Sequence, residues 1–168
     1  PNRGFDLYLE SDAPVGTGLG ASGALSALVV ALVDNYLGLH STKHHLAETA
    51  FEISRSIQGV KVGRQDEYSA VFGGCNFMEF GRGPATVVPL RLEPWIIGEL
   101  EYHALLCYTR KQRLPDFAVN EHIETFLQGR GETVEALGRL KELAYECRDN
   151  LLRGDIPAVA RNLHEGGL

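Results

Sequence analysis

A glycine-rich loop runs directly into an apolar segment that is too long to be a strand. Small and apolar residues dominate residues 21–37, and a glycine follows at position 38. The large apolar members recur at the spacing of a helical turn: Leu25, Leu28, Val29, Leu32, Val33 and Tyr36. This pattern predicts a helix that Gly38 terminates. Because the helix is apolar on nearly every side, we expect it to be central in the fold.

The flanking segments predict a mixed α+β chain. Phe5, Leu7 and Leu9 alternate with polar residues, which predicts a half-buried strand before the loop. Further strands are predicted over residues 75–80, 86–92 and 101–108, and further helices over residues 117–127, 133–152 and after Asp155. The composition changes from glycine and strand formers to charged helical sequence, which predicts two domains, residues 1–93 and 94–168, with a boundary near Pro94.

A second helix is predicted over residues 42–56, with Ser41 or Thr42 as its N-cap. Its inward residues are predicted at helical spacing: Leu46, Ala50 and Ile53. The chain starts at a proline and stops just after a short helical pattern. We therefore expect an internal fragment of a longer protein.

Composition excludes several classes of protein. An apolar fraction of 44% is globular, and a formal charge of −6 argues against a nucleic-acid surface. No apolar run reaches the length of a membrane span, so no membrane partner is expected. Cys75, Cys107 and Cys147 are widely spaced without a CxxC pair. This spacing favours buried free thiols, with Cys75 in the core, in a reducing compartment such as the cytoplasm.

The glycine-rich loop has the properties of a phosphate site. Residues 14–24 read PVGTGLGASGA, between a predicted strand and a predicted helix. Glycine allows backbone N–H groups to converge, and the start of a helix adds free donors and a positive dipole end. A Walker loop fails here because no Gly-Lys-Ser/Thr occurs, and the glycines at positions 16, 18 and 20 are not spaced as the GxGxxG of a dinucleotide fingerprint requires. A tight turn with close packing is the alternative.

A second stretch places an acidic residue among glycines. Residues 63–74 read GRQDEYSAVFGG. Asp66 could accept the proton of an attacking hydroxyl, a role that contributes about 10²–10⁴-fold to a rate. A surface aspartate in a loop is the alternative. Arg64 could stabilise charge near a phosphoryl group or be a solvent-exposed charge.

Together the two strings resemble the motifs of the GHMP kinases. The first resembles Pro-x-Gly-x-Gly-Leu-Gly-Ser-Ser-Ala, with Ala21 and Gly23 as departures. The resemblance implies an α+β GHMP kinase fold, with a two-layer ribosomal-protein-like N-terminal domain and part of a ferredoxin-like domain. It implies ATP and Mg²⁺ as cofactors, with Asp66 and Arg64 as catalytic residues. The implied phosphate-binding residues are Pro14, Gly16, Gly18, Leu19, Gly20, Ala21 and Ser22, and the implied metal ligands are Ser22 and Glu52.

The wider match is similar to the branch that phosphorylates the anomeric hydroxyl of D-glycero-D-manno-heptose 7-phosphate. That branch carries Glu-x-Glu in the second helix, where this chain has Ser54 at the second position. Its Tyr-Thr-Gly-x-x-Arg-x-Ser is also altered here, although Lys111 and Arg113 could still meet a sugar phosphate. A kinase for fucose or an amino-sugar, and a non-catalytic nucleotide-binding relative, therefore stay open.

The resemblance also implies parts that these 168 residues do not contain. They lack the family's first strand motif and its last glycine-rich loop, so the fragment alone is expected to be inactive. The implied partner is a small sugar or sugar phosphate, and a homodimer is allowed.

Overall fold

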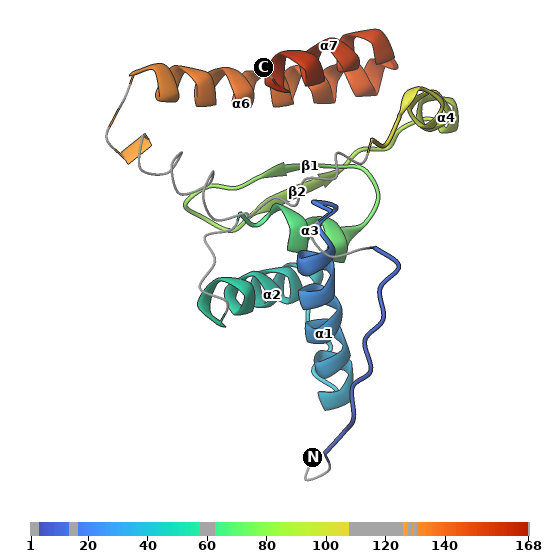
Figure 1. Ribbon diagram of the computed structural model, residues 1–168, viewed down its shortest axis with the longest axis vertical. Coiled ribbons are helices and arrows are strands. Elements are labelled where there is room, and N and C mark those ends of the chain that lie inside the picture. The colour runs from blue at the N-terminus through green and yellow to red at the C-terminus, as the bar shows by residue number, and fades with distance from the viewer. Residues whose placement is uncertain are drawn as a thin grey trace. The chain divides into compact units, whose positions relative to one another are not determined.

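The computed structural model describes residues 4–13, 17–57, 63–107, 126–127, 129 and 131–167 (Figure 1). The contacts divide the chain into two compact units. The first unit contains the described residues up to Gly74 together with Phe80–Ala85, and the second contains Cys75–Glu79, Thr86–Cys107 and the described residues from 126 onward. The domain boundary expected near Pro94 stays a prediction.

Helix α1 (Ala21–Leu37) forms where the apolar run predicts it, and Gly38 ends it in the left-handed conformation at φ 68°. The expectation that it is central is wrong for the described residues. Gly23 and Ala27 are buried, but Leu28 is 51% exposed. Helices α2 and α3 both pack against α1, but they bury only its small residues fully.

Helix α2 (Lys43–Ile57) confirms the second predicted helix and crosses α1 in Figure 1. The Thr42 hydroxyl accepts a hydrogen bond from the His45 N–H at 3.3 Å, which confirms threonine as the cap. The buried face is turned slightly from the predicted one, since Ile53 is exposed. The residues of that face are Ala47, Ala50, Phe51 and Ser54.

Helix α3 (Gln65–Phe72) occupies the glycine-flanked stretch for which no helix was predicted. It ends at Gly73, whose N–H donates to the Ser69 carbonyl at 3.0 Å. The helix packs against α1 and α2. The Tyr68 ring is 2% exposed, and its centroid lies 5.3 Å from that of Phe80. Aromatic packing thus fixes α3 on a core in which most of the other buried residues are small.

The second unit contains the only sheet found among the described residues. Strands β1 (Asn76–Glu79) and β2 (Thr86–Pro89) pair antiparallel, and Phe77 lies opposite Val88. These strands confirm the predicted hairpin. The half-buried strand predicted around Leu7 is wrong, because residues 4–13 are irregular and pair with no described strand.

Three helices complete the second unit. Helix α4 (Pro94–His103), which Pro94 starts in its first turn, takes residues 101–103 of the strand predicted over residues 101–108, and residues 104–107 are irregular. Helices α6 (Gly131–Arg153) and α7 (Ile156–Gly167) confirm the C-terminal predictions. Arg139 joins them by donating to Glu165 at 2.6 Å. Of the helix predicted over residues 117–127, only residues 126–127 are described, and they are helical.

The cysteines do not occupy the predicted core. Cys75 and Cys107 are exposed and Cys147 is half-buried, and all three are free thiols. Cys75 lies just before β1, where its carbonyl accepts from the Leu90 N–H at 2.9 Å, so the backbone rather than the thiol is engaged. None of the helices in the described ranges combines the length and apolar character that crossing a membrane requires.

Gly154→Ala is expected to destabilise the second unit. Gly154 has φ 73°, and a Cβ at this position would lie 2.2 Å from Trp95 Cη2. The left-handed conformation costs a non-glycine residue about 1–2 kcal/mol, and displacing the indole adds to this. Urea unfolding followed by circular dichroism measures the effect. Gly38→Ala is the matched control, because Gly38 has a similar φ of 68° and open space around it. Equal losses in the two variants would remove the indole contact from the explanation.

Candidate functional site

The glycine-rich loop ends in a helix start with free donors. Gly18 and Gly20 both have positive φ, at 74° and 72°, and Gly20 is the N-cap of α1. The Gly20 carbonyl accepts from the Ala24 N–H at 3.0 Å, so the N–H groups of Ala21 and Ser22 precede the first helical bond. Leu19 is exposed between the glycines. Pro14 and Gly16 lie outside the described residues, as do Lys111 and Arg113.

The structure brings Asp66 to this loop. A Cβ placed on Gly20 would lie 3.5 Å from Asp66 Cγ, and 3.6 and 3.8 Å from the two carboxylate oxygens. Asp66 is the second residue of α3 and is exposed. The two strings that the sequence singles out are therefore in contact, although 45 positions separate Gly20 from Gln65 at the start of α3.

Gly23 permits the close approach of α3. A Cβ at Gly23 would lie 2.6 Å from Asp66 Cβ, 3.1 Å from the Asp66 carbonyl carbon and 3.2 Å from the Glu67 nitrogen. Two of these atoms belong to the backbone, which cannot turn aside as a flexible side chain can. Glycine at this position thus fixes how near the Asp66 carboxylate comes to the loop.

Two neighbouring acidic side chains of α3 have different surroundings. Glu67 is 3% exposed, and its Oε2 has no hydrogen-bond partner among the described residues. A buried polar atom without a partner costs about 1–3 kcal/mol. Asp66 is exposed beside the glycines. Of these two carboxylates, Asp66 is thus the one accessible to a bound molecule.

Arg64 is held by a glutamate that the sequence pattern did not single out. Its Nε and Nη2 donate to Glu48 Oε1 at 3.1 and 2.9 Å, and the Tyr68 hydroxyl donates to Glu48 Oε2 at 2.8 Å. The guanidinium also lies 5.1 Å from the centroid of the Phe51 ring. Arg64 is therefore fixed in position rather than freely solvated. The sequence feature that could have identified Glu48 is its position in the predicted second helix, next to the apolar face.

The same network shifts the titration of Tyr68. Burial, followed by the hydrogen bond to Glu48, raises the pKa of Tyr68 to about 12. An unfolded tyrosine ionises near pH 10, so between about pH 10 and 12 the unfolded state loses a proton that the folded state keeps. Folding stability present below pH 10 is therefore lost as the pH rises through this window, by up to about 1.4 kcal/mol per pH unit.

Tyr68→Phe is expected to remove the tyrosine that ionises near pH 12. Titration followed by tyrosinate absorbance should show a group near pH 12 in the parent protein that is lost in the variant. Tyr145, whose pKa the hydrogen bond to Glu79 also raises, should still ionise above the ordinary tyrosine range in both proteins. The loss of stability above pH 10 should also become shallower. Tyr102→Phe is the control, because Tyr102 is 83% exposed. An absorbance change near pH 12 that is equally large in Tyr68→Phe and in the parent protein would contradict the assignment.

The predicted metal ligands are not gathered into an acidic cluster. The described residues contain no group of three or more His, Cys, Asp or Glu side chains suited to a metal. Ser22 is exposed in the first turn of α1, and Glu52 is exposed outside the buried face of α2. Ser54, where the resembling branch has glutamate, is 4% exposed and donates to the Ser26 hydroxyl at 3.1 Å. A Mg²⁺ ion usually takes only one or two protein oxygens beside phosphates and water, and Ser22 fits such a site.

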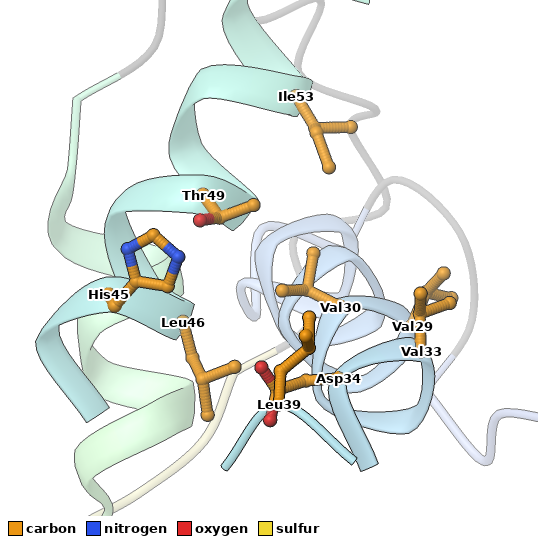
Figure 2. Close-up of a pocket in the computed structure, with 9 residues that line it drawn as sticks. All are labelled: Val29, Val30, Val33, Asp34, Leu39, His45, Leu46, Thr49 and Ile53. Atoms are coloured by element: carbon orange, nitrogen blue, oxygen red, sulfur yellow. The ribbon is translucent and has the colours of Figure 1, made fainter. Parts of the chain in front are cut away.

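A separate groove lies between α1 and α2 (Figure 2). Its volume is about 200 Å³, and its lining is mostly apolar. The lining residues are Val29, Val30, Val33, Asp34, Leu39, His45, Leu46, Thr49 and Ile53. None of them belongs to the predicted site, so the groove is distinct from the glycine loop and from Asp66.

Comparison with known proteins gives consistent matches. Residues 1–74 match the family described as the N-terminal domain of GHMP kinases. Over 160 residues the chain is 36% identical to the D-glycero-alpha-D-manno-heptose 7-phosphate kinase of Campylobacter jejuni. The aligned region covers 95% of this chain and 47% of that protein. It is also 28% identical to the bifunctional fucokinase/GDP-fucose pyrophosphorylase of Arabidopsis thaliana, over 98% of this chain and 16% of that protein.

A solved structure supports the same fold. The crystal structure of a Campylobacter jejuni protein assigned as a sugar kinase superimposes with a TM-score of 0.64 at 30% identity. The match covers 92% of this chain and 43% of the other. The chain thus spans about half the length, or less, of the relatives it matches. The mixed helix and strand fold expected from the sequence is confirmed.

Proposed function

This chain belongs to the GHMP kinases through residues 1–74, and we propose that its full-length protein is an ATP-dependent sugar kinase. The enzyme transfers the γ-phosphoryl group to a hydroxyl, the anomeric one, of a sugar or sugar phosphate such as D-glycero-D-manno-heptose 7-phosphate. The proximity of the Asp66 carboxylate to Gly20 carries the proposal, because it places an acid–base group beside the proposed phosphate-binding loop.

The reaction requires a nucleophile, an electrophile and a proton acceptor in one place. The loop from Pro14 to Ser22 would hold the phosphates of ATP, with the N–H groups of Ala21 and Ser22 as donors. The acceptor hydroxyl attacks the γ-phosphorus, the bond to the β–γ bridging oxygen breaks, and ADP leaves. Asp66 takes the hydroxyl proton or orients the hydroxyl. Positioning and charge stabilisation supply most of the rate, as phosphoryl transfer requires.

In this proposal the protein supplies only two ligands to the Mg²⁺ ion. Mg²⁺, when bound with ATP, neutralises charge on the β- and γ-phosphates. Ser22 would hold it in the first turn of α1, with Glu52 as the second proposed ligand. Arg64, held by Glu48, would add positive charge beside the acceptor. We also place the enzyme in the cytoplasm, where ATP is available and free thiols persist, and leave a homodimer as its proposed assembly.

Product analysis tests the proposal directly. The full-length protein is incubated with Mg-ATP and heptose 7-phosphate, and products are followed by phosphorus NMR. A new anomeric phosphate signal with matching release of ADP is expected. Parallel incubations with fucose and with amino-sugars would identify a different acceptor if one of these sugars is phosphorylated instead. ATP left intact with every sugar would reject the kinase activity.

One observation favours a second candidate function. Ser54 replaces a carboxylate of the resembling branch, and its hydroxyl is buried against Ser26 rather than available to a metal. A non-catalytic relative that binds nucleotide would tolerate this change. Calorimetric binding of Mg-ATP without turnover in the full-length protein would support this candidate over the kinase.

A further inference from the structure

An open cavity lies at the N-terminus of α3, next in sequence to Asp66. Its volume is about 460 Å³, within the range of small-ligand sites. We call it the arginine cavity, and its lining residues are Phe51, Arg55, Gly63, Arg64, Gln65 and Phe80. All six belong to the first compact unit. The cavity is therefore built within one unit.

The lining carries positive charge in an acidic chain. It contains two guanidinium groups and no described carboxylate, although the chain has a formal charge of −6. Arg64 is already fixed by Glu48 and by the face of Phe51. Arg55 is exposed and forms no ion pair with any other residue in the described parts of the chain. Its charge is thus free for a ligand, and arginine suits phosphate through paired N–H donors.

The backbone adds donors on the same side. Arg64 is the N-cap of α3, and the first helical hydrogen bond runs from the Tyr68 N–H to the Arg64 carbonyl at 3.2 Å. The N–H of Gln65, which lines the cavity, precedes that bond and has no acceptor within the helix. Two arginines and the start of a helix therefore line one cavity of suitable size.

Resting on the kinase activity proposed above, we propose that the arginine cavity binds a phosphate group that the acceptor sugar already carries. The phosphates of ATP belong to the glycine loop, which meets Asp66 at Gly20. Arg64 and Gln65 precede Asp66 on the same helical turn and line the cavity instead. The acceptor then presents its hydroxyl to Asp66 and its own phosphate to the arginines. Phe80, which is 41% exposed, offers apolar surface to the sugar.

Paired acceptors test this assignment in the full-length protein. Steady-state kinetics are measured with heptose 7-phosphate and with the same heptose lacking its phosphate. Arg55→Gln is expected to raise KM for the phosphorylated acceptor at least tenfold, with kcat and the KM for ATP unchanged. The dephosphorylated acceptor should be affected less than twofold. Arg55→Lys should restore part of the loss, and Arg153→Gln, at an exposed position on α6, should change nothing.

The outcomes separate this inference from the kinase proposal. Equal effects of Arg55→Gln on both acceptors, or no effect on either, would overturn the cavity assignment while the kinase stands. If no acceptor is phosphorylated, the kinase proposal fails, and binding of inorganic phosphate by calorimetry then decides the cavity by itself. Binding that Arg55→Gln abolishes supports a phosphate site there, and binding that survives the change overturns it.

Discussion

Asp66→Asn is expected to lower kcat of the full-length protein by about 10²–10⁴-fold, the usual contribution of a general base. The asparagine keeps the size of the side chain, so the packing of its Cβ against Gly23 is retained. The amide cannot take the proton of an acceptor hydroxyl. Because the backbone donors of the glycine loop are unchanged, the Kd for Mg-ATP should stay within about twofold. Single-turnover kinetics and calorimetry measure the two quantities separately.

Asp6→Asn is the control for this prediction, since Asp6 is an exposed aspartate in the irregular N-terminal segment. It should leave kcat unchanged. A parallel loss of ATP affinity in Asp66→Asn would show that Asp66 holds the nucleotide rather than the acceptor. A kcat within threefold of the parent would remove Asp66 from the chemistry altogether.

Gly23→Ala is expected to damage both stability and catalysis. The added methyl would lie 2.6 Å from Asp66 Cβ and within 3.2 Å of two backbone atoms of α3, so the helix must shift. Overpacking of this kind costs about 1–3 kcal/mol. A catalytic group displaced by about 1 Å can lose about 10²-fold in rate. Urea unfolding and kcat measure the two effects on one preparation.

The matched control is the same change in another helix. Gly138 lies in α6 with no atom within 4 Å of its would-be Cβ, so Gly138→Ala should stabilise the protein by about 0.5–1 kcal/mol. The two variants are thus expected to have effects of opposite sign. A gain in stability for Gly23→Ala as well would mean that α3 does not lie against α1 as closely as the structure shows.

The local sequence pattern was sufficient to predict the helices whose start and end signals lie within or beside the helix itself. The apolar run ending at Gly38 predicts α1, and Thr42 marks the start of α2. Helix α3 was missed because its glycine-flanked sequence is short and its aromatic contacts, such as Tyr68 with Phe80, come from distant parts of the chain. The alternation around Leu7 predicted a strand, but a strand also requires a partner, and no described segment pairs with it.

The sequence predicted those parts of the site in which the residue type itself indicates the chemistry. Glycines before a helix and an aspartate between glycines drew attention to Gly20 and Asp66, and the structure brings them together. Sequence alone could not reveal that Glu48 orients Arg64, because that ion pair depends on how α2 lies against α3. Nor could it explain Gly23, whose small size matters only against the backbone of another helix.

Trp95 is the single tryptophan of the sequence, and it lies against Gly154 in the second compact unit. Its intrinsic fluorescence therefore reports the folding of that unit alone, without labelling. The first unit contains no tryptophan and is followed instead through any tyrosine signal that changes apart from the tryptophan signal, because Tyr102 and Tyr145 belong to the second unit and report it together with Trp95. Two emission signals from one sample can thus show whether the units unfold in one step or in two, and which of them Mg-ATP protects.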